Sequence, residues 1–253
     1  MKSLILYENG AHRWIVLGRD EKKRSDIIDT NQFAVLTDDG VCLLDPGGIE
    51  IFPTVLSELT RYVDPEEVKV LFSSHQDPDI ISSLSMWLDI CPDARVYTSW
   101  LWTGFLSHFC MGEPVTMEAL PDEGGRIPVG KSAVRLEAVP AHYCHSSGNF
   151  SVWDPKARIL FSGDIGAALL PDHEANLFVE SFTDHISTME AFHRRWMPSR
   201  EALHDWIRRV RELDPQMICP QHGSIFRGEN VGLFLDWLES LEVGCAIEQT
   251  VAS

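Results

Sequence analysis

Basic residues are scarce in this sequence. Its 253 residues include 21 lysines and arginines against 38 aspartates and glutamates, which gives a formal net charge of −17. Nucleic acids and anionic membranes attract proteins mainly through clusters of Lys and Arg. We therefore expect neither nucleic acid nor a membrane surface among the partners of this chain.

Long apolar runs are missing as well. No stretch approaches the roughly 20 apolar residues that a membrane-spanning helix needs, and the charge at Glu8 breaks the apolar N-terminal run too early for a secretory signal. These absences predict a soluble, cytoplasmic protein. Because the chain shows no evident internal linker, we expect a single domain over residues 1–253.

Paired cysteines are also lacking. The sequence has six cysteines and no Cys-x-x-Cys pair, and several of the six, such as Cys42 and Cys219, lie in apolar segments. Such positions are typical of small buried side chains. The cysteines are therefore expected to be reduced and buried, as is usual in the cytoplasm.

The order of apolar segments indicates an α/β fold. Strand-like runs cover residues 14–17, 32–37, 41–44, 68–74, 133–139, 149–153, 158–161 and 216–219, and helical spacing is found after residue 48, over 81–88, around 190–197, over 201–213 and near the C-terminus. Strands and helices alternate in both halves of the chain. Two such sheet-and-helix halves could stack as a four-layer sandwich.

A cluster of metal-binding residue types follows the run 68–74. His75, Asp77 and Asp79 stand on alternate residues, and Pro78 stiffens the spacing between the two carboxylates. Imidazole and carboxylate groups are common metal ligands. This turn could hold two cations side by side if other loops supplied the remaining donors.

Three further candidate donors end strand-like runs in the same way: His142, Asp164 and His222. A single His or Gly-Asp after a strand is usually a turn or a hydrogen-bonded surface group. The carboxyl ends of strands, however, gather at one edge of an open sheet. Together these residues predict a metal centre with three imidazoles and three carboxylates.

The same residues carry a family resemblance. The order His75-x-Asp77-x-Asp79, His142, Ser162-Gly-Asp164, Pro220-Gln-His-Gly223 resembles the metallo-β-lactamase superfamily, and within it the di-iron branch of flavodiiron proteins and oxygen-binding di-iron proteins. The stretches 45–48, 142–150 and 161–166 are also similar to that branch. The resemblance implies an α/β fold (α+β in some schemes) that forms a four-layer αβ/βα sandwich with metals at one edge. It also implies a homodimer.

Two departures from the superfamily pattern bear on the metals. Hydrolases of the superfamily carry His-x-His-x-Asp-His, whereas this chain has Asp77 at the second His and Ile80 at the last. An additional hard oxygen donor favours iron or manganese over zinc. Ile80 cannot bind a metal, so one position of the second metal is expected to be open.

The resemblance implies two iron ions, with zinc or manganese as alternatives. The first iron would be held by His75, Asp77 and His142, the second by Asp79 and His222, and Asp164 would bridge the two. His145 competes with His142 as a ligand or could instead hydrogen-bond a ligating carboxylate. Tyr97 could reach the pocket, although a core tyrosine is the alternative.

Four functions are compatible with this pattern. The leading hypothesis is a di-iron protein that binds dioxygen at the open position, as an oxygen sensor or carrier with a signalling protein as partner. A second is a reductase of oxygen or nitric oxide supplied by an external flavoprotein or rubredoxin, since no flavin is expected on this chain. The third is a metal-dependent hydrolase, and the fourth is a binding module without a metal.

Overall fold

The computed structural model describes residues 3–17, 27–109, 115–170 and 176–245. In these residues the first sheet has seven strands in the order of their sequence: β1 (Leu4–Asn9), β2 (His12–Val16), β3 (Phe33–Thr37), β4 (Gly40–Leu44), β5 (Val68–Phe72), β6 (Arg95–Ser99) and β7 (Met117–Leu120). β1 to β4 form an antiparallel meander, and β4 to β7 run parallel. Every residue of β4 is buried, because layers cover both faces of the sheet.

Short helices cover the outer face of the first sheet. They are α1 (Phe52–Leu59), α2 (Pro78–Ile81), α3 (Leu84–Ile90) and α4 (Thr103–Leu106), with 3-10 turns η1 (Pro65–Glu67) and η2 (Ser107–Phe109). α1 buries Phe52, Val55 and Leu59, which are spaced at i, i+3 and i+7. The ring of Phe52 meets that of Trp87 from α3 edge to face at 5.1 Å.

The second sheet follows in the chain. Its six described strands have the spatial order β13 (Phe226–Arg227), β12 (Met217–Pro220), β11 (Ile159–Gly163), β10 (Phe150–Asp154), β9 (Arg135–Pro140) and β8 (Gly125–Pro128). Only the β11–β12 pair among these runs parallel. The two sheets pack face to face. The rings of Phe33 and Phe72 from the first sheet contact the ring of Phe161 from the second, with centroids 5.7 Å and 6.4 Å apart.

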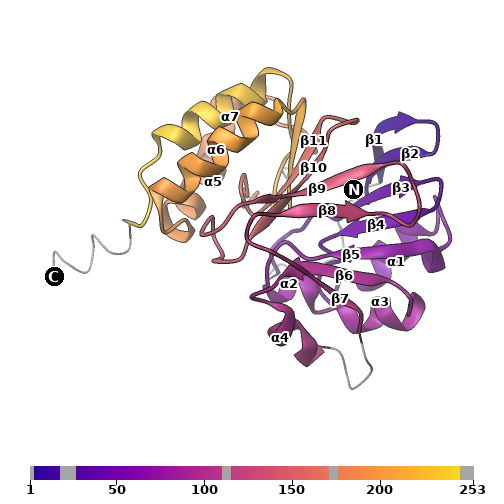
Figure 1. Ribbon diagram of the computed structural model, residues 1–253. Helices are drawn as coiled ribbons and strands as arrows, with labels where there is room; N and C mark the ends of the chain where they lie inside the picture. Colours follow the sequence, from indigo (N-terminus) through magenta and orange to yellow (C-terminus); the bar gives the residue numbers. More distant parts are fainter. Residues whose placement is uncertain (1–2, 18–26, 110–114, 171–175, 246–253) are drawn as a thin grey trace.

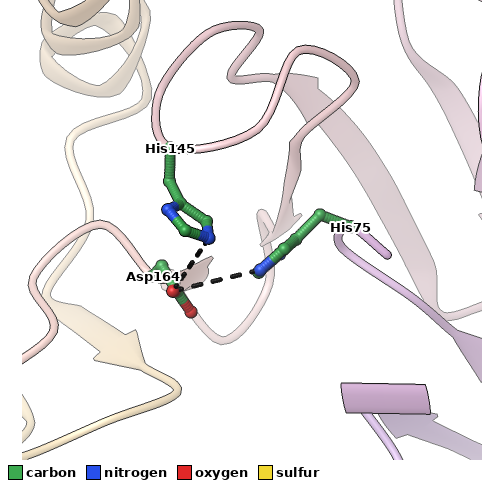
Figure 2. Close-up of side chains that lie close together, drawn as sticks. All are labelled: His75, His145 and Asp164. Atoms are coloured by element: carbon green, nitrogen blue, oxygen red, sulfur yellow. Dashed lines mark ion pairs between the residues drawn. The ribbon is translucent and has the colours of Figure 1, made fainter. Parts of the chain in front are cut away.

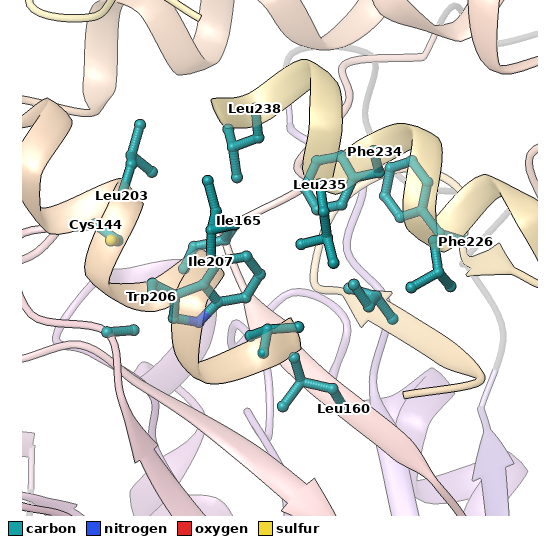
Figure 3. Close-up of a cluster of buried hydrophobic side chains, with 14 of the residues drawn as sticks. Cys144, Leu160, Ile165, Leu203, Trp206, Ile207, Phe226, Phe234, Leu235 and Leu238 are labelled. Carbon is teal, nitrogen blue, oxygen red and sulfur yellow. The ribbon is translucent and has the colours of Figure 1, made fainter. Parts of the chain in front are cut away.

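Three longer helices cover the second sheet: α5 (Phe182–Trp196), α6 (Arg200–Leu213) and α7 (Glu229–Ser240). α6 starts where the Ser199 side chain accepts a hydrogen bond from Ala202 N at 3.2 Å, and ends where Asp214 takes a left-handed conformation. Its apolar face packs against side chains of β11 and α7 (Figure 3).

The layers therefore run helices, sheet, sheet, helices (Figure 1), and the predicted α/β fold is confirmed. The predicted helix over 81–88 is instead the end of α2 followed by α3, because the chain turns at Ser82 and Ser83. The sequence patterns also did not predict β1, β7, β8 and β13, which are short or partly exposed. Within the described residues, no helix is long and apolar enough to cross a membrane.

Candidate metal centre

Three of the candidate donors lie just after β5. His75 is 1% exposed, and Asp77 is the N-cap residue of α2, which begins at Pro78. Proline suits the first position of a helix, because its fixed φ is helical and its missing N–H has no partner there in any case. This short helix holds Asp77 and Asp79 beside each other, with side chains 31% and 30% exposed.

Asp164 and His222 come from the second sheet. Asp164 follows β11 after Gly163, whose φ of +58° allows the sharp turn. His222 follows β12, and its Nδ1 lies 2.8 Å from the carbonyl oxygen of Asp29, which fixes the ring. The Nε2 of His222 is 3.4 Å from Asp79 Oδ2 and 3.4 Å from Asp164 Oδ1.

His145, and not His142, completes this group. His145 Nε2 lies 3.0 Å from Asp77 Oδ2 and 3.5 Å from Asp164 Oδ2, and the ring faces His75 at 4.8 Å between centroids (Figure 2). His145, His75 and Asp164 each offer one ligand atom, and these atoms lie within 4.8 Å of one another.

The structure places His142 away from the other donors, in contrast to the prediction. Its Nε2 donates to the carbonyl oxygen of Asp122 at 2.7 Å, and its ring packs edge to face on Phe150 at 5.0 Å. Tyr143 and His145 both have left-handed backbones, with φ of +60° and +75°. These two conformations turn the loop, so that side chains three residues apart point to different neighbours.

Asp164 lies between two groups of donors. Its Oδ2 faces His75 at 3.9 Å and His145 at 3.5 Å, with Asp77 next to both, and its Oδ1 faces His222. Asp164 Oδ1 is buried and makes no hydrogen bond within the described residues. Buried carboxylate oxygens normally have such partners. The arrangement and its donor types fit two cations that share this carboxylate.

Ile80 adds no polar donor to either group. Its side chain is fully buried among apolar residues between the first sheet and the helices that cover it. Tyr97 is also outside the centre, since it lies 6% exposed in β6 in the apolar layer between the sheets. His173, which has no metal-ligand spacing in the sequence, lies outside the described residues.

The electrostatics of the centre favour the ionised forms of Asp77 and Asp164 and the protonated forms of His75 and His222. Burial alone would raise the pKa of Asp77 and Asp164, but neighbouring histidines more than reverse this effect and lower the pKa of both. Burial would likewise lower the pKa of His222, but Asp164 and Asp79 raise it to about 9. Cations that bound these atoms would have to replace protons on the imidazoles.

The pH dependence of the metal-free protein follows from His222. Its pKa in the folded state lies above the ordinary value of 6.5, so the stabilising ion pairs are fully present below pH 6.5 and are lost as the pH rises toward about 9. We expect the Tm of metal-free protein to fall over this range, while the rise in Tm caused by zinc increases because fewer protons compete. Calorimetry with and without saturating zinc measures both trends.

The control for this pH profile is the exposed His204. His204→Gln should keep both trends, and His222→Gln should flatten the fall in the Tm of metal-free protein. A metal-free Tm that is constant from pH 6.5 to 9 would contradict the ionisation state derived for His222.

Several neighbours of the centre were not predicted. Gln76 accepts from Ser146 Oγ at 2.8 Å and donates to Asp77 Oδ1 at 2.9 Å, which ties the His145 loop to that carboxylate. His193 of α5 is fully buried and accepts from Gly166 N at 2.9 Å, which supports the loop that carries Asp164. Burial lowers the pKa of His193 to about 4, so this imidazole is neutral.

No local pattern in the sequence marks His193, because its spacing in α5 is that of an ordinary buried helical residue. The ring of Trp196, one turn further along α5, lies 5.1 Å from that of His145 and is 53% exposed. Gln76 could have been found from its place between two candidate donors.

Two helix-covered sheets with His and carboxylate side chains at the carboxyl ends of their strands define a metallo-β-lactamase-like protein. The family model described as "ODP family beta lactamase" matches residues 28–223. The chain belongs to this family.

Solved structures and a curated relative agree with this assignment. A structure titled "Peroxy diiron species of chemotaxis sensor ODP" is 36% identical, with 99% of this chain and 100% of that one covered and a TM-score of 0.86. Its apo state, from T. denticola, matches with a TM-score of 0.84 at 36% identity over 99% of both chains. An uncharacterized protein of Methanocaldococcus jannaschii is 23% identical over 190 residues, which are 73% of this chain and 46% of that relative. The chain therefore spans less than half the length of this curated relative.

The flavodiiron fold is shared as well. The rubredoxin:oxygen oxidoreductase of Desulfovibrio gigas matches with a TM-score of 0.79 at 18% identity, over 93% of this chain and 61% of that one. At this identity the likeness shows a common fold.

Proposed function

We propose that this chain is a non-haem di-iron protein that binds dioxygen and acts as an oxygen sensor. The carrying observation is the pair of donor groups that share Asp164, in a chain 36% identical to a chemotaxis sensor whose structure is titled as a peroxy diiron species. The donor set, rich in carboxylate and imidazole, suits iron.

The first metal position takes His75, Asp77, His145 and one oxygen of Asp164 in this proposal. The second takes Asp79, His222 and the other oxygen of Asp164. His145 replaces His142 in the ligand set, because His145 Nε2 lies 3.5 Å from Asp164 Oδ2 whereas His142 Nε2 is bonded to a backbone carbonyl. Two irons in these positions would supply the electrons with which dioxygen is bound.

The second position has fewer protein donors than the first. Asp79 and His222 are its only donors among the described residues apart from the shared Asp164, and the neighbouring residue Ile80 is apolar. These features support an open coordination position at the second metal as part of the proposal. The partly exposed side chains of Asp77 and Asp79 lie on the solvent side of the centre, where a small ligand would enter.

The two histidines of the 141–149 loop provide a matched test of the ligand set. His145→Ala should lower the iron content of the first position and weaken its affinity by at least about 100-fold, more than the loss typical of residues behind the ligands. His142→Ala should keep full iron content, although it loses the bond to Asp122. Iron per chain is measured by elemental analysis after anaerobic loading and desalting. The reverse order of the two variants would return His142 to the ligand set.

The function itself is tested by oxygen titration. Anaerobically reduced, iron-loaded protein exposed to dioxygen should develop a charge-transfer band in the near-ultraviolet or visible, and loading with zinc should give none. Bound iron without any band contradicts the proposal. Zinc as the native metal, together with hydrolysis of a generic ester, would support a hydrolase instead.

A reductase would use the same metal ligands as a sensor. The two functions are distinguished by whether the protein consumes its gas continuously. Steady consumption of oxygen or nitric oxide with a supplied flavoprotein or rubredoxin donor would favour it, whereas a sensor should bind and release oxygen without sustained turnover. The sensor proposal includes a signalling partner and a homodimer. Light scattering of the purified chain tests whether it forms a dimer.

A further inference from the structure

Asp45 is a buried carboxylate that belongs to neither donor group. It follows β4 directly, is fully buried and has a left-handed φ of +46°. Its backbone N–H donates to the carbonyl oxygen of Phe72 at 2.9 Å, which places it beside the end of β5. A buried carboxylate in a strained conformation needs partners that account for its position.

Within the described part of the chain, both hydrogen-bond donors to this carboxylate come from Ser74, the residue before His75. The Ser74 backbone N–H donates to Asp45 Oδ1 at 2.8 Å, and the Ser74 hydroxyl lies 2.6 Å from Asp45 Oδ2. The same hydroxyl lies 2.9 Å from His75 Nδ1. Asp45, Ser74 and His75 therefore form a continuous chain of hydrogen bonds that ends on the far side of a candidate ligand.

Only one arrangement of protons satisfies this chain when Asp45 is ionised. An ionised carboxylate can only accept, so the single hydroxyl hydrogen of Ser74 must point to Asp45 Oδ2. The contact of 2.9 Å then requires His75 Nδ1–H to donate to Ser74 Oγ. Neutral His75 consequently has its lone pair on Nε2, the atom that lies 3.6 Å from Asp77 Oδ2 and 3.9 Å from Asp164 Oδ2.

We propose that Asp45 is a positioning residue for the metal centre, which acts through Ser74 to hold His75 in the tautomer that presents Nε2 to a metal. This inference rests on the proposed function, because it takes His75 as a ligand. Groups that hydrogen-bond the distal nitrogen of a ligating histidine orient the ring and raise its basicity.

The Nδ1 atoms of the other two histidines of the centre have surroundings that differ from those of His75 Nδ1. His222 Nδ1 faces the backbone carbonyl of Asp29, an acceptor that side-chain substitutions elsewhere do not change. His145 Nδ1 is buried and has no hydrogen-bond partner within the described residues. The chain of hydrogen bonds from Asp45 through Ser74, called the relay below, therefore reaches only His75 among the three histidines. His222 serves as an internal control.

The isosteric variant Asp45→Asn tests the direction of the relay. The Ser74 backbone N–H needs an acceptor, so the amide oxygen must take the place of Asp45 Oδ1 and the NH2 group must face the hydroxyl. The hydroxyl then donates to His75 Nδ1, and the neutral ring must carry its proton on Nε2. The substitution keeps the shape of the side chain but reverses the tautomer.

The first measurement is a long-range 1H–15N correlation spectrum of the histidines in metal-free protein at alkaline pH. Burial raises the pKa of Asp45 to about 7, so this carboxylate is ionised there. We expect Nδ1–H for His75 in the parent and Nε2–H in Asp45→Asn, with His222 unchanged. The Nδ1–H tautomer for His75 in both proteins would overturn the proposal, whatever metal the centre binds.

The second measurement is zinc affinity by competition with a chelator. The zinc affinity of Asp45→Asn should be about 10- to 100-fold weaker than that of the parent, the range found when partners of ligating histidines are removed. Ser74→Ala, which removes the hydroxyl without reversing the relay, should lose less, and it provides the test if Asp45→Asn does not fold. An affinity that falls more in Ser74→Ala than in a folded Asp45→Asn would contradict control through the tautomer. If the parent protein binds zinc and both tautomers are as expected, but the iron-loaded protein develops no oxygen-dependent band, the proposed oxygen binding is refuted and the role of Asp45 stands.

Discussion

Replacing Asp164 with alanine should abolish stable metal binding at both positions. Each oxygen of this carboxylate faces a different donor group, Oδ2 toward His75 and His145 and Oδ1 toward His222. One substitution therefore removes a ligand and a compensating negative charge from each metal. Loss of a direct ligand should exceed the roughly 10- to 100-fold effect of residues that only support ligands.

Elemental analysis after anaerobic iron loading and desalting measures this effect. Asp89→Ala on the exposed face of α3 removes an equal charge without touching the centre and should keep the metal content of the parent. Circular dichroism of the metal-free variants confirms that both are folded. If Asp164→Ala retains one full equivalent of iron, the carboxylate serves a single position and the bridging assignment fails.

Replacing Ile80 with histidine should have two opposite effects. In metal-free protein it places an imidazole where a fully buried apolar side chain now packs between the first sheet and its helices. The loss of packing and the burial of a polar ring should reduce the free energy of unfolding by about 3 kcal/mol. In iron-loaded protein an imidazole that turned out of this layer toward Asp79 and His222 would supply the missing donor of the second position, recover part of that stability and weaken oxygen binding.

Thermal unfolding with and without iron and an oxygen titration measure both effects. Ile80→Val is the matched control, because it keeps the position apolar and should cost only about 1 kcal/mol without closing the open position. A histidine variant that binds oxygen like the parent and gains no additional stability from iron would show that residue 80 does not face the second metal.

The sequence predicted the edge at which the centre lies, because that edge is encoded locally. His75, Asp164 and His222 each follow an apolar run, and those runs are β5, β11 and β12. The choice between His142 and His145 is not local. It depends on two left-handed residues in the loop and on contacts with Asp122 and Asp77, which come from distant segments.

The supporting residues were harder to predict for the same reason. His193 belongs to a helix of the outer layer, and its role depends on the fold that brings it to Gly166. Asp45 stands in a stretch that resembles the family, yet its role appears only when parallel pairing places the ends of β4 and β5 side by side. The end of a strand can be predicted from local sequence, whereas the contacts between strand ends depend on how the strands pair in the fold.

Each proposed metal position takes donors from both sheets: His75, Asp77 and Asp79 follow β5 of the first, and His145, Asp164 and His222 follow strands of the second. A metal ion there would tie together halves of the molecule that otherwise meet through apolar packing and a small set of hydrogen bonds, such as that from Trp14 Nε1 to Asp154 Oδ2. Separating the sheets would release both metals, so the folded state gains stability in proportion to the logarithm of free metal once the sites are near saturation. Amide hydrogen exchange in the strands that face each other should therefore slow as iron is supplied, and the lifetime of the chain against proteolysis becomes a measure of available metal.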